Sequence, residues 1–208
     1  MKPPIPIYLA VEDDLSEWLL RRLLKGRSVA YAEGPVFKRN GFGFLRKNAV
    51  AFNNMAKVCP VLLLTDLDRH PCPPGLVREW LQQPKHKDFL LRVAVREVEA
   101  WVLAADASLG GFLGIRRRVV FPTPERLSDP KLELLKLASD SPRRDLRDAL
   151  VRREGGGNLR QGPAYNSTLA TFIRDEWQPA VAAERCPSLS RLLNALTAME
   201  ADWEGRRQ

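Results

Sequence analysis

In the first half of the chain, short apolar runs alternate with longer segments whose apolar residues recur at helical spacing. The runs are typical of strands buried on both faces of a sheet. They occupy residues 5–11, 59–65 and 89–95, with a further candidate at 28–37. The helical segments are expected at 15–25, 44–57 and 76–83, with another beginning at 96–101. Strands that alternate with helices predict a mostly parallel sheet with right-handed crossovers.

After Gly114 the pattern changes, because helical spacing continues while strand-like runs no longer occur. The expected helices lie at residues 131–138, 145–153, 169–177 and 188–203. A glycine-rich segment at 154–158 interrupts them. We therefore predict an α/β fold: a Rossmann-like domain over residues 1–114, and a helical C-terminal extension over residues 115–208 that packs on it.

The composition favours a polyanionic partner without identifying one. The chain has 33 basic and 25 acidic side chains, a net charge of +8. Its three cysteines, Cys59, Cys72 and Cys186, show no paired spacing, which argues against a disulfide framework or a zinc knuckle. No stretch has the character of a signal peptide or a membrane span. We expect a cytoplasmic protein that does not associate with membranes.

Acidic residues follow three of the predicted strands. Glu12 follows the first, and Asp66 and Asp68 follow the run at 59–65. Glu97 and Glu99 follow the run at 89–95. Parallel strands bring their carboxyl ends to one rim, where the functional groups of such sheets gather. Crowded carboxylates repel one another, and a hard divalent cation, Mg²⁺ or Mn²⁺, would compensate them. We therefore predict one divalent-metal site at this rim.

Each acidic group also has a purely structural interpretation. Asp13, Asp14 or Ser16 can cap the helix that follows the first strand. Asp66 and Asp68 can be turn residues before the proline-rich loop, and the later pair of glutamates can be first-turn acids of a helix. These alternatives stay open for each group taken alone. The occurrence of all three groups at strand ends favours the metal site.

A strand that ends in glutamate, followed by a later strand that ends in Asp-x-Asp, resembles the TOPRIM domain of topoisomerases, bacterial primases and OLD-family nucleases. The matching stretches are IYLAVE, up to Glu12, and VLLLTDLD, up to Asp68. Asp13 stands where the family usually has a glycine. The segment REVEAW at 96–101 looks like a motif of small standalone TOPRIM-like bacterial proteins, often encoded near ABC-type ATPases in defence loci. The resemblance implies a magnesium-dependent site in which Glu12 is the catalytic acid or base and Asp66 and Asp68 hold the metal.

The leading hypothesis is a metal-dependent nuclease that hydrolyses DNA or RNA, with an ABC-type ATPase as a further partner that the resemblance implies. Its catalytic residues would be Glu12, Asp66 and Asp68, and Glu97 and Glu99 would complete the metal site. Basic residues are expected to bind backbone phosphates. The candidates are Arg69, Arg96, Arg116, Arg117, Arg118 and Arg160. The run at 116–118 equally fits a solvated loop, and the loop at 155–165 fits either a phosphate cradle or a plain linker.

Other classes of function fit parts of the same pattern. A non-catalytic module that binds nucleic acid or an ATPase is compatible with the charge and the helical tail. A phosphate-accepting receiver domain also has acids after its first strand and an aspartate after a middle strand. A haloacid-dehalogenase-type phosphatase also uses Asp-x-Asp, but its motif normally follows the first strand and precedes Gly-Thr. Here Arg69 and His70 follow the motif.

Overall fold

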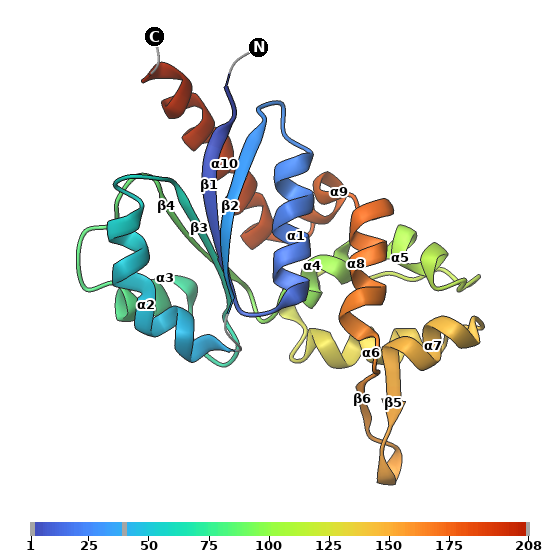
Figure 1. Cartoon of the computed structure of the whole chain (residues 1–208). Helices are drawn as coiled ribbons and strands as arrows, with labels where there is room; N and C mark the ends of the chain where they lie inside the picture. Colours follow the sequence, from blue (N-terminus) through green and yellow to red (C-terminus); the bar gives the residue numbers. More distant parts are fainter. Residues whose placement is uncertain (1–2, 39–40, 207–208) are drawn as a thin grey trace. The chain divides into compact units, whose positions relative to one another are not determined.

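The computed structural model describes residues 3–38 and 41–206 (Figure 1). The chain forms two compact units. One contains the described residues up to Val95 together with those from Ser188 onward, and the other runs from Arg96 to Pro187. This division differs from the expected boundary after residue 114. The last helix groups with the sheet, and the segment that follows the fourth strand groups with the later helices.

The first unit is built on a four-stranded sheet in which every neighbouring pair is parallel. The strands are β1 (Ile5–Val11), β2 (Tyr31–Lys38), β3 (Val61–Asp66) and β4 (Phe89–Ala94). Their order across the sheet is β2-β1-β3-β4. The expected α/β class with a parallel, Rossmann-like sheet is confirmed.

Three helices connect these strands: α1 (Asp14–Lys25), α2 (Phe42–Met55) and α3 (Pro73–Trp80). The connection from β1 to β2 runs one way across the sheet, and those from β2 to β3 and from β3 to β4 run the other way. Right-handed crossovers therefore place α1 on one face and α2 and α3 on the opposite face, as Figure 1 shows. The direction reverses between β1 and β3, so their carboxyl ends flank the switch point of the sheet, where open α/β sheets bind ligands.

The face beneath α2 and α3 carries a continuous apolar core. Val61, Leu63 and Leu91 from the strands pack with Phe52 and Trp80 from the helices. Leu62 and Leu64 alternate to the opposite face and are also fully buried. Burial on both faces explains why the sequence of β3 shows an unbroken apolar run rather than an alternating one.

The final helix, α10 (Pro187–Gly205), is held to the sheet unit by polar contacts at both its ends. Near its start, the hydroxyl of Ser188 accepts a hydrogen bond from the N–H of Val95 at 3.4 Å. Near its end, the buried carboxylate of Glu200 accepts two hydrogen bonds from Arg27, of 2.6 and 2.8 Å. Tyr31 donates a third, of 2.8 Å, to the same carboxylate. Within the described ranges, no helix is both long and apolar enough to cross a membrane.

The second unit is mainly helical, as expected for the later part of the chain. Its α-helices are α4 (Glu99–Ala104), α5 (Asp106–Phe112), α6 (Pro130–Ser139), α7 (Arg144–Leu150), α8 (Tyr165–Asp175) and α9 (Pro179–Ala183). Short 3₁₀ turns lie at Pro124–Arg126 and Gly155–Gly157. The indole N–H of Trp177 donates to the carbonyl of Trp101 at 3.0 Å, and both side chains are fully buried.

A β-hairpin replaces part of the expected helix at 145–153 and the expected loop at 155–165. Its strands, β5 (Val151–Arg153) and β6 (Leu159–Gln161), pair antiparallel. Gly156 and Gly157 form the turn with φ values of 81° and 83°, in the left-handed region that glycine tolerates. The prediction of helix up to residue 153 was wrong, because α7 ends at Leu150. The backbone groups of residues 151–153 form hydrogen bonds with β6 instead of continuing the helix.

Gly162, which follows β6, is expected to tolerate no side chain. Its N–H donates to the carbonyl of Leu150 at 2.8 Å, and an added Cβ would lie 2.7 Å from the carbonyl carbon of Ala149. We expect Gly162→Ala to lower the free energy of unfolding by about 1–3 kcal/mol, the usual cost of overpacking. Chemical denaturation would measure this. Gly155→Ala is the matched control, since a Cβ at Gly155 meets no atom within 4 Å. Equal stability of the two variants would contradict the expectation.

Candidate active site at the carboxyl ends of β1 and β3

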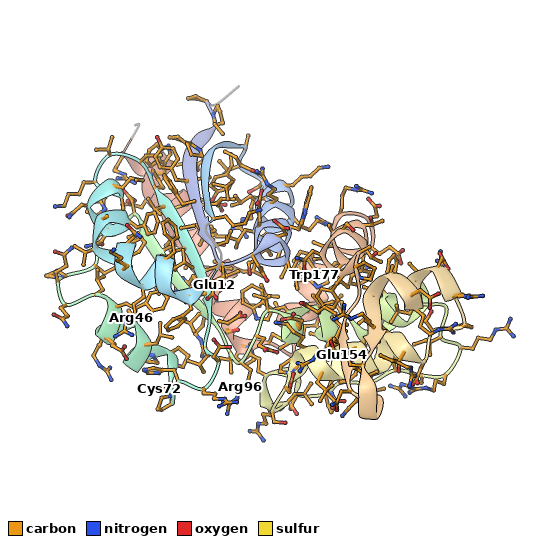
Figure 2. The ribbon with its side chains drawn as sticks, turned by 60° about the horizontal axis from the view of Figure 1, so that its bottom comes forward. Glu12, Arg46, Cys72, Arg96, Glu154 and Trp177 are labelled. Atoms are coloured by element: carbon orange, nitrogen blue, oxygen red, sulfur yellow. The ribbon has the colours of Figure 1, made fainter. Side chains whose placement is uncertain are left out.

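Glu12 lies directly after β1, at the switch point of the sheet (Figure 2). The register between β1 and β3 pairs Leu9 with Leu62 and Ala10 with Leu63. Continued by two residues, this register brings Glu12 beside Thr65, the second-last residue of β3. The two strands that the sequence predicted separately are therefore neighbours, and their terminal polar groups meet.

One carboxylate oxygen of Glu12 is fixed by two donors from β3. Its Oε1 accepts a hydrogen bond from the hydroxyl of Thr65 and another, of 3.1 Å, from the N–H of Asp66. Burial raises the pKa of Glu12 above its ordinary value, and the negative charges of Asp68 and Asp13 raise it further. The two hydrogen bonds act in the opposite direction without cancelling the shift in pKa. A carboxyl group with a raised pKa and a fixed orientation is the arrangement expected of a general acid or base.

The two aspartates of the Asp-x-Asp motif lie in different backbone environments. Asp66 is the last residue of β3 and is partly buried. The N–H of Leu67 still donates to the carbonyl of Ala94 in β4, at 2.9 Å. Asp68 is exposed and has a φ of 48°, so it belongs to a turn. In a continuous strand, Asp66 and Asp68 would point to the same face, but β3 ends at Asp66, so this alternation does not extend to Asp68. The negative charge of Asp68 still acts on Glu12.

The acids after Glu12 have structural roles. Asp13 is the N-cap of α1, and its Oδ1 accepts a hydrogen bond from the N–H of Ser16 at 2.8 Å. Asp14 forms an ion pair with Lys38 of β2. The capping interpretation thus holds for Asp13, in the position where the resembled family usually has glycine.

Within residues 3–38 and 41–206, no group of three or more His, Cys, Asp or Glu side chains is placed to hold a metal ion. A preformed cage of three ligands is therefore not a feature of the described chain. Mg²⁺ often requires less, since it keeps several waters and is held by one or two carboxylates together with substrate phosphates. Asp66, partly buried beside Glu12 at the end of β3, fits this second mode as one carboxylate ligand. The divalent-metal site stays a prediction.

Glu97 and Glu99 belong to the second unit, where both meet Lys131 at the start of α6. Glu97 accepts a hydrogen bond from the N–H of Lys131 at 3.0 Å. Glu99 is almost completely buried, 3.5 Å from the ammonium of Lys131, and accepts a hydrogen bond from Tyr165 at 3.1 Å. These contacts give both glutamates a role within their own unit.

The predicted phosphate-binding arginines are all exposed, and some of them have acidic partners. Arg69 follows Asp68 in the turn beyond β3. Arg117 pairs with Asp140 at 2.6 Å, and Arg160 pairs with Glu154 at 3.2 Å. Arg116 and Arg118 flank Arg117 in an exposed loop. Arg96 opens the second unit with a φ of 65°.

Thr65 is the site residue that the sequence analysis missed. It is buried, and its hydroxyl holds the carboxylate of Glu12. Its signal was a hydroxyl-bearing side chain at the end of an otherwise apolar run, directly before the first aspartate.

Comparison of the chain with models of known protein families, with curated proteins and with solved structures gave no match.

Proposed function

We propose that the protein is a magnesium-dependent nuclease of TOPRIM type that hydrolyses phosphodiester bonds. The observation that carries the proposal is the environment of Glu12: a carboxyl group with raised pKa, oriented by Thr65 and Asp66, at the switch point of a parallel sheet. The motif resemblance and the net charge of +8 support the same reaction class.

Each residue of this site would have a distinct task. Glu12 would take the proton from the attacking water or deliver one to the leaving oxygen, a role that its raised pKa favours. Thr65 would keep its carboxylate in one orientation. Asp66 would hold the metal, with Asp68 contributing from the turn. A bound Mg²⁺ would supply Lewis-acid stabilisation of charge on the phosphate.

The proposal is tested by cleavage assays on supercoiled DNA, linear DNA and structured RNA with Mg²⁺ or Mn²⁺. We expect metal-dependent cleavage of at least one substrate that EDTA abolishes and that Asp66→Asn reduces by about 100-fold or more. Asp175→Asn is the control, because Asp175 is exposed and pairs with the neighbouring Arg174 at 2.7 Å. Absence of cleavage on every substrate, or equal cleavage by Asp66→Asn and the control, would overturn the proposal.

A second candidate function is a binding module without turnover. It is favoured by the absence, in the described residues, of a preformed group of three metal ligands. It predicts salt-sensitive binding of DNA or RNA with no metal-dependent cleavage. Copurification with an ABC-type ATPase would support that partnership, which the resemblance alone suggests, under either function. The receiver-like alternative is less favoured. A receiver domain carries a lysine after its last strand, whereas Val95 and Arg96 follow β4, the last strand along the chain in the described parallel sheet.

A further inference from the structure

A basic groove follows the edge strand β4 within the first unit. It encloses a volume of about 590 Å³. The start of α3 lines one side, the start of α10 lines the other, and residues 91–93 of β4 lie between them. The groove contains four cationic side chains: Arg78, Lys85, Arg92 and Arg191. No acidic side chain lines it among the residues that the structure describes.

Arg92 is the deepest of these cations. It alternates with Leu91 and Val93, which belong to the core beneath α2 and α3, and it is partly buried. Its Nε is sealed from solvent and has no hydrogen-bond partner in the described chain. Burial and the like charge of Arg191 lower the pKa of Arg92, and burial and the like charge of Arg92 lower the pKa of Lys85. Like charges held close together around a buried, unpaired donor favour the binding of an anion.

The geometry points to the phosphodiester backbone of a single-stranded nucleic acid as the occupant of this groove. Guanidinium groups bind phosphate oxygens in a bidentate manner. The start of α10 adds the positive end of a helix dipole beside Arg191. Val77, Leu91 and Val93 offer apolar surface for sugars and bases between the cations. The partly buried position of Arg92 between α3 and α10 favours a single strand, whose flexible backbone can enter the groove, over a rigid duplex.

The residues of this groove lie outside the acidic site. A role for the groove in guiding substrate to that site rests on the proposed function. Pro73 and Pro74 belong to the groove, and they follow the turn that carries Asp68 by five and six residues. A single-stranded nucleic acid bound along β4 would therefore extend toward the end of the sheet at which β3 terminates. None of the arginines expected from the sequence lies in this groove.

The test measures binding of fluorescent oligothymidylate and oligouridylate to the full chain by anisotropy, in EDTA, so that catalysis plays no part. We expect Arg92→Gln with Arg191→Gln to weaken binding about tenfold or more and to reduce the salt slope by about 1.4, since each phosphate contact of a single strand contributes about 0.7. The matched control removes two exposed arginines that have partners, Arg144→Gln with Arg174→Gln. Arg191→Gln alone, at an exposed position, gives a second variant whose folding is not at issue.

Three results would overturn the inference: equal binding by the groove variant and the control, equal binding of duplex and single strand by the wild type, or complete displacement of the oligonucleotide by inorganic phosphate at low millimolar concentration. A structural role for Arg92 also predicts loss of thermal stability in Arg92→Gln. The inference instead predicts unchanged or greater stability, because the substitution removes charge repulsion. Binding without cleavage would leave the groove in place and count only against the nuclease.

Discussion

Glu12→Gln is expected to reduce metal-dependent cleavage by about 10²–10⁴-fold, the usual contribution of a general acid or base. Glutamine keeps the acceptor oxygen that receives the hydrogen bonds of Thr65 and Asp66, so the geometry of the site is retained. It cannot exchange a proton in the working pH range. Single-turnover cleavage with Mg²⁺ measures the effect, and Asp175→Asn serves again as the control.

The same variant is expected to be at least as stable as the wild type at neutral pH. The pKa of Glu12 is raised in the folded chain, so folding opposes its ionisation. The protonated carboxyl of Glu12 therefore contributes stability that is fully present below the pKa of Glu12 in the unfolded chain. This contribution is lost as the pH rises through the pKa of Glu12 in the folded chain. The advantage of Glu12→Gln in free energy of unfolding should therefore be greatest above that window and disappear in acid. Denaturation at several pH values tests this.

Two outcomes would contradict this account of Glu12. Cleavage by Glu12→Gln at the wild-type rate would remove it from the chemistry. A large loss of stability in Glu12→Gln at neutral pH would make the carboxylate a structural tie between β1 and β3. Active sites commonly lower the stability of an enzyme. Loss of activity in Glu12→Gln together with unchanged or greater stability would therefore indicate a catalytic rather than a structural role for Glu12.

The sequence was most informative where one local property determined the structure. The run at 5–11 became β1 with those same limits, since a β-rich apolar run buried on both faces has few alternatives. The helix expected at 15–25 begins at Asp14, after the cap at Asp13. The parallel sheet followed from the alternation of these elements.

The sequence was less informative where distant segments meet. The contact of Thr65 with Glu12 depends on the register between two strands that a third strand and two helices separate along the chain. The hairpin of β5 and β6 depends on pairing across Gly156 and Gly157, which a helical pattern up to residue 153 concealed. The groove beside β4 requires α10, more than ninety residues later in the chain, to lie beside Arg92. Local patterns carry no information about such long-range neighbours.

The partner of Glu97 and Glu99 is likewise a distant residue in the sequence, Lys131 of α6. As acids after a strand they resembled metal ligands, but Lys131 lies close to both. If this lysine is the structural counterion of the buried Glu99, Lys131→Met should lower the free energy of unfolding substantially. Loss of one partner of a buried pair costs about 3–5 kcal/mol. Lys131 is about one-third exposed, with 35% of its side chain accessible, so we expect about 2–3 kcal/mol after allowance for solvent screening.

Denaturation of Lys131→Met, with and without Mg²⁺, separates the structural role of these glutamates from a role in metal binding. Lys136→Met is the matched control, since Lys136 lies on the same helix and pairs only with the partly exposed Glu133 among the ion pairs described, at 2.7 Å. A purely structural pair predicts a loss that Mg²⁺ does not restore, because a buried carboxylate with a tyrosine donor offers the ion few ligands. Restoration of stability by millimolar Mg²⁺ would instead return Glu97 and Glu99 to the metal site. A loss no larger than that of Lys136→Met would show that solvent, rather than Lys131, stabilises the charge of Glu99.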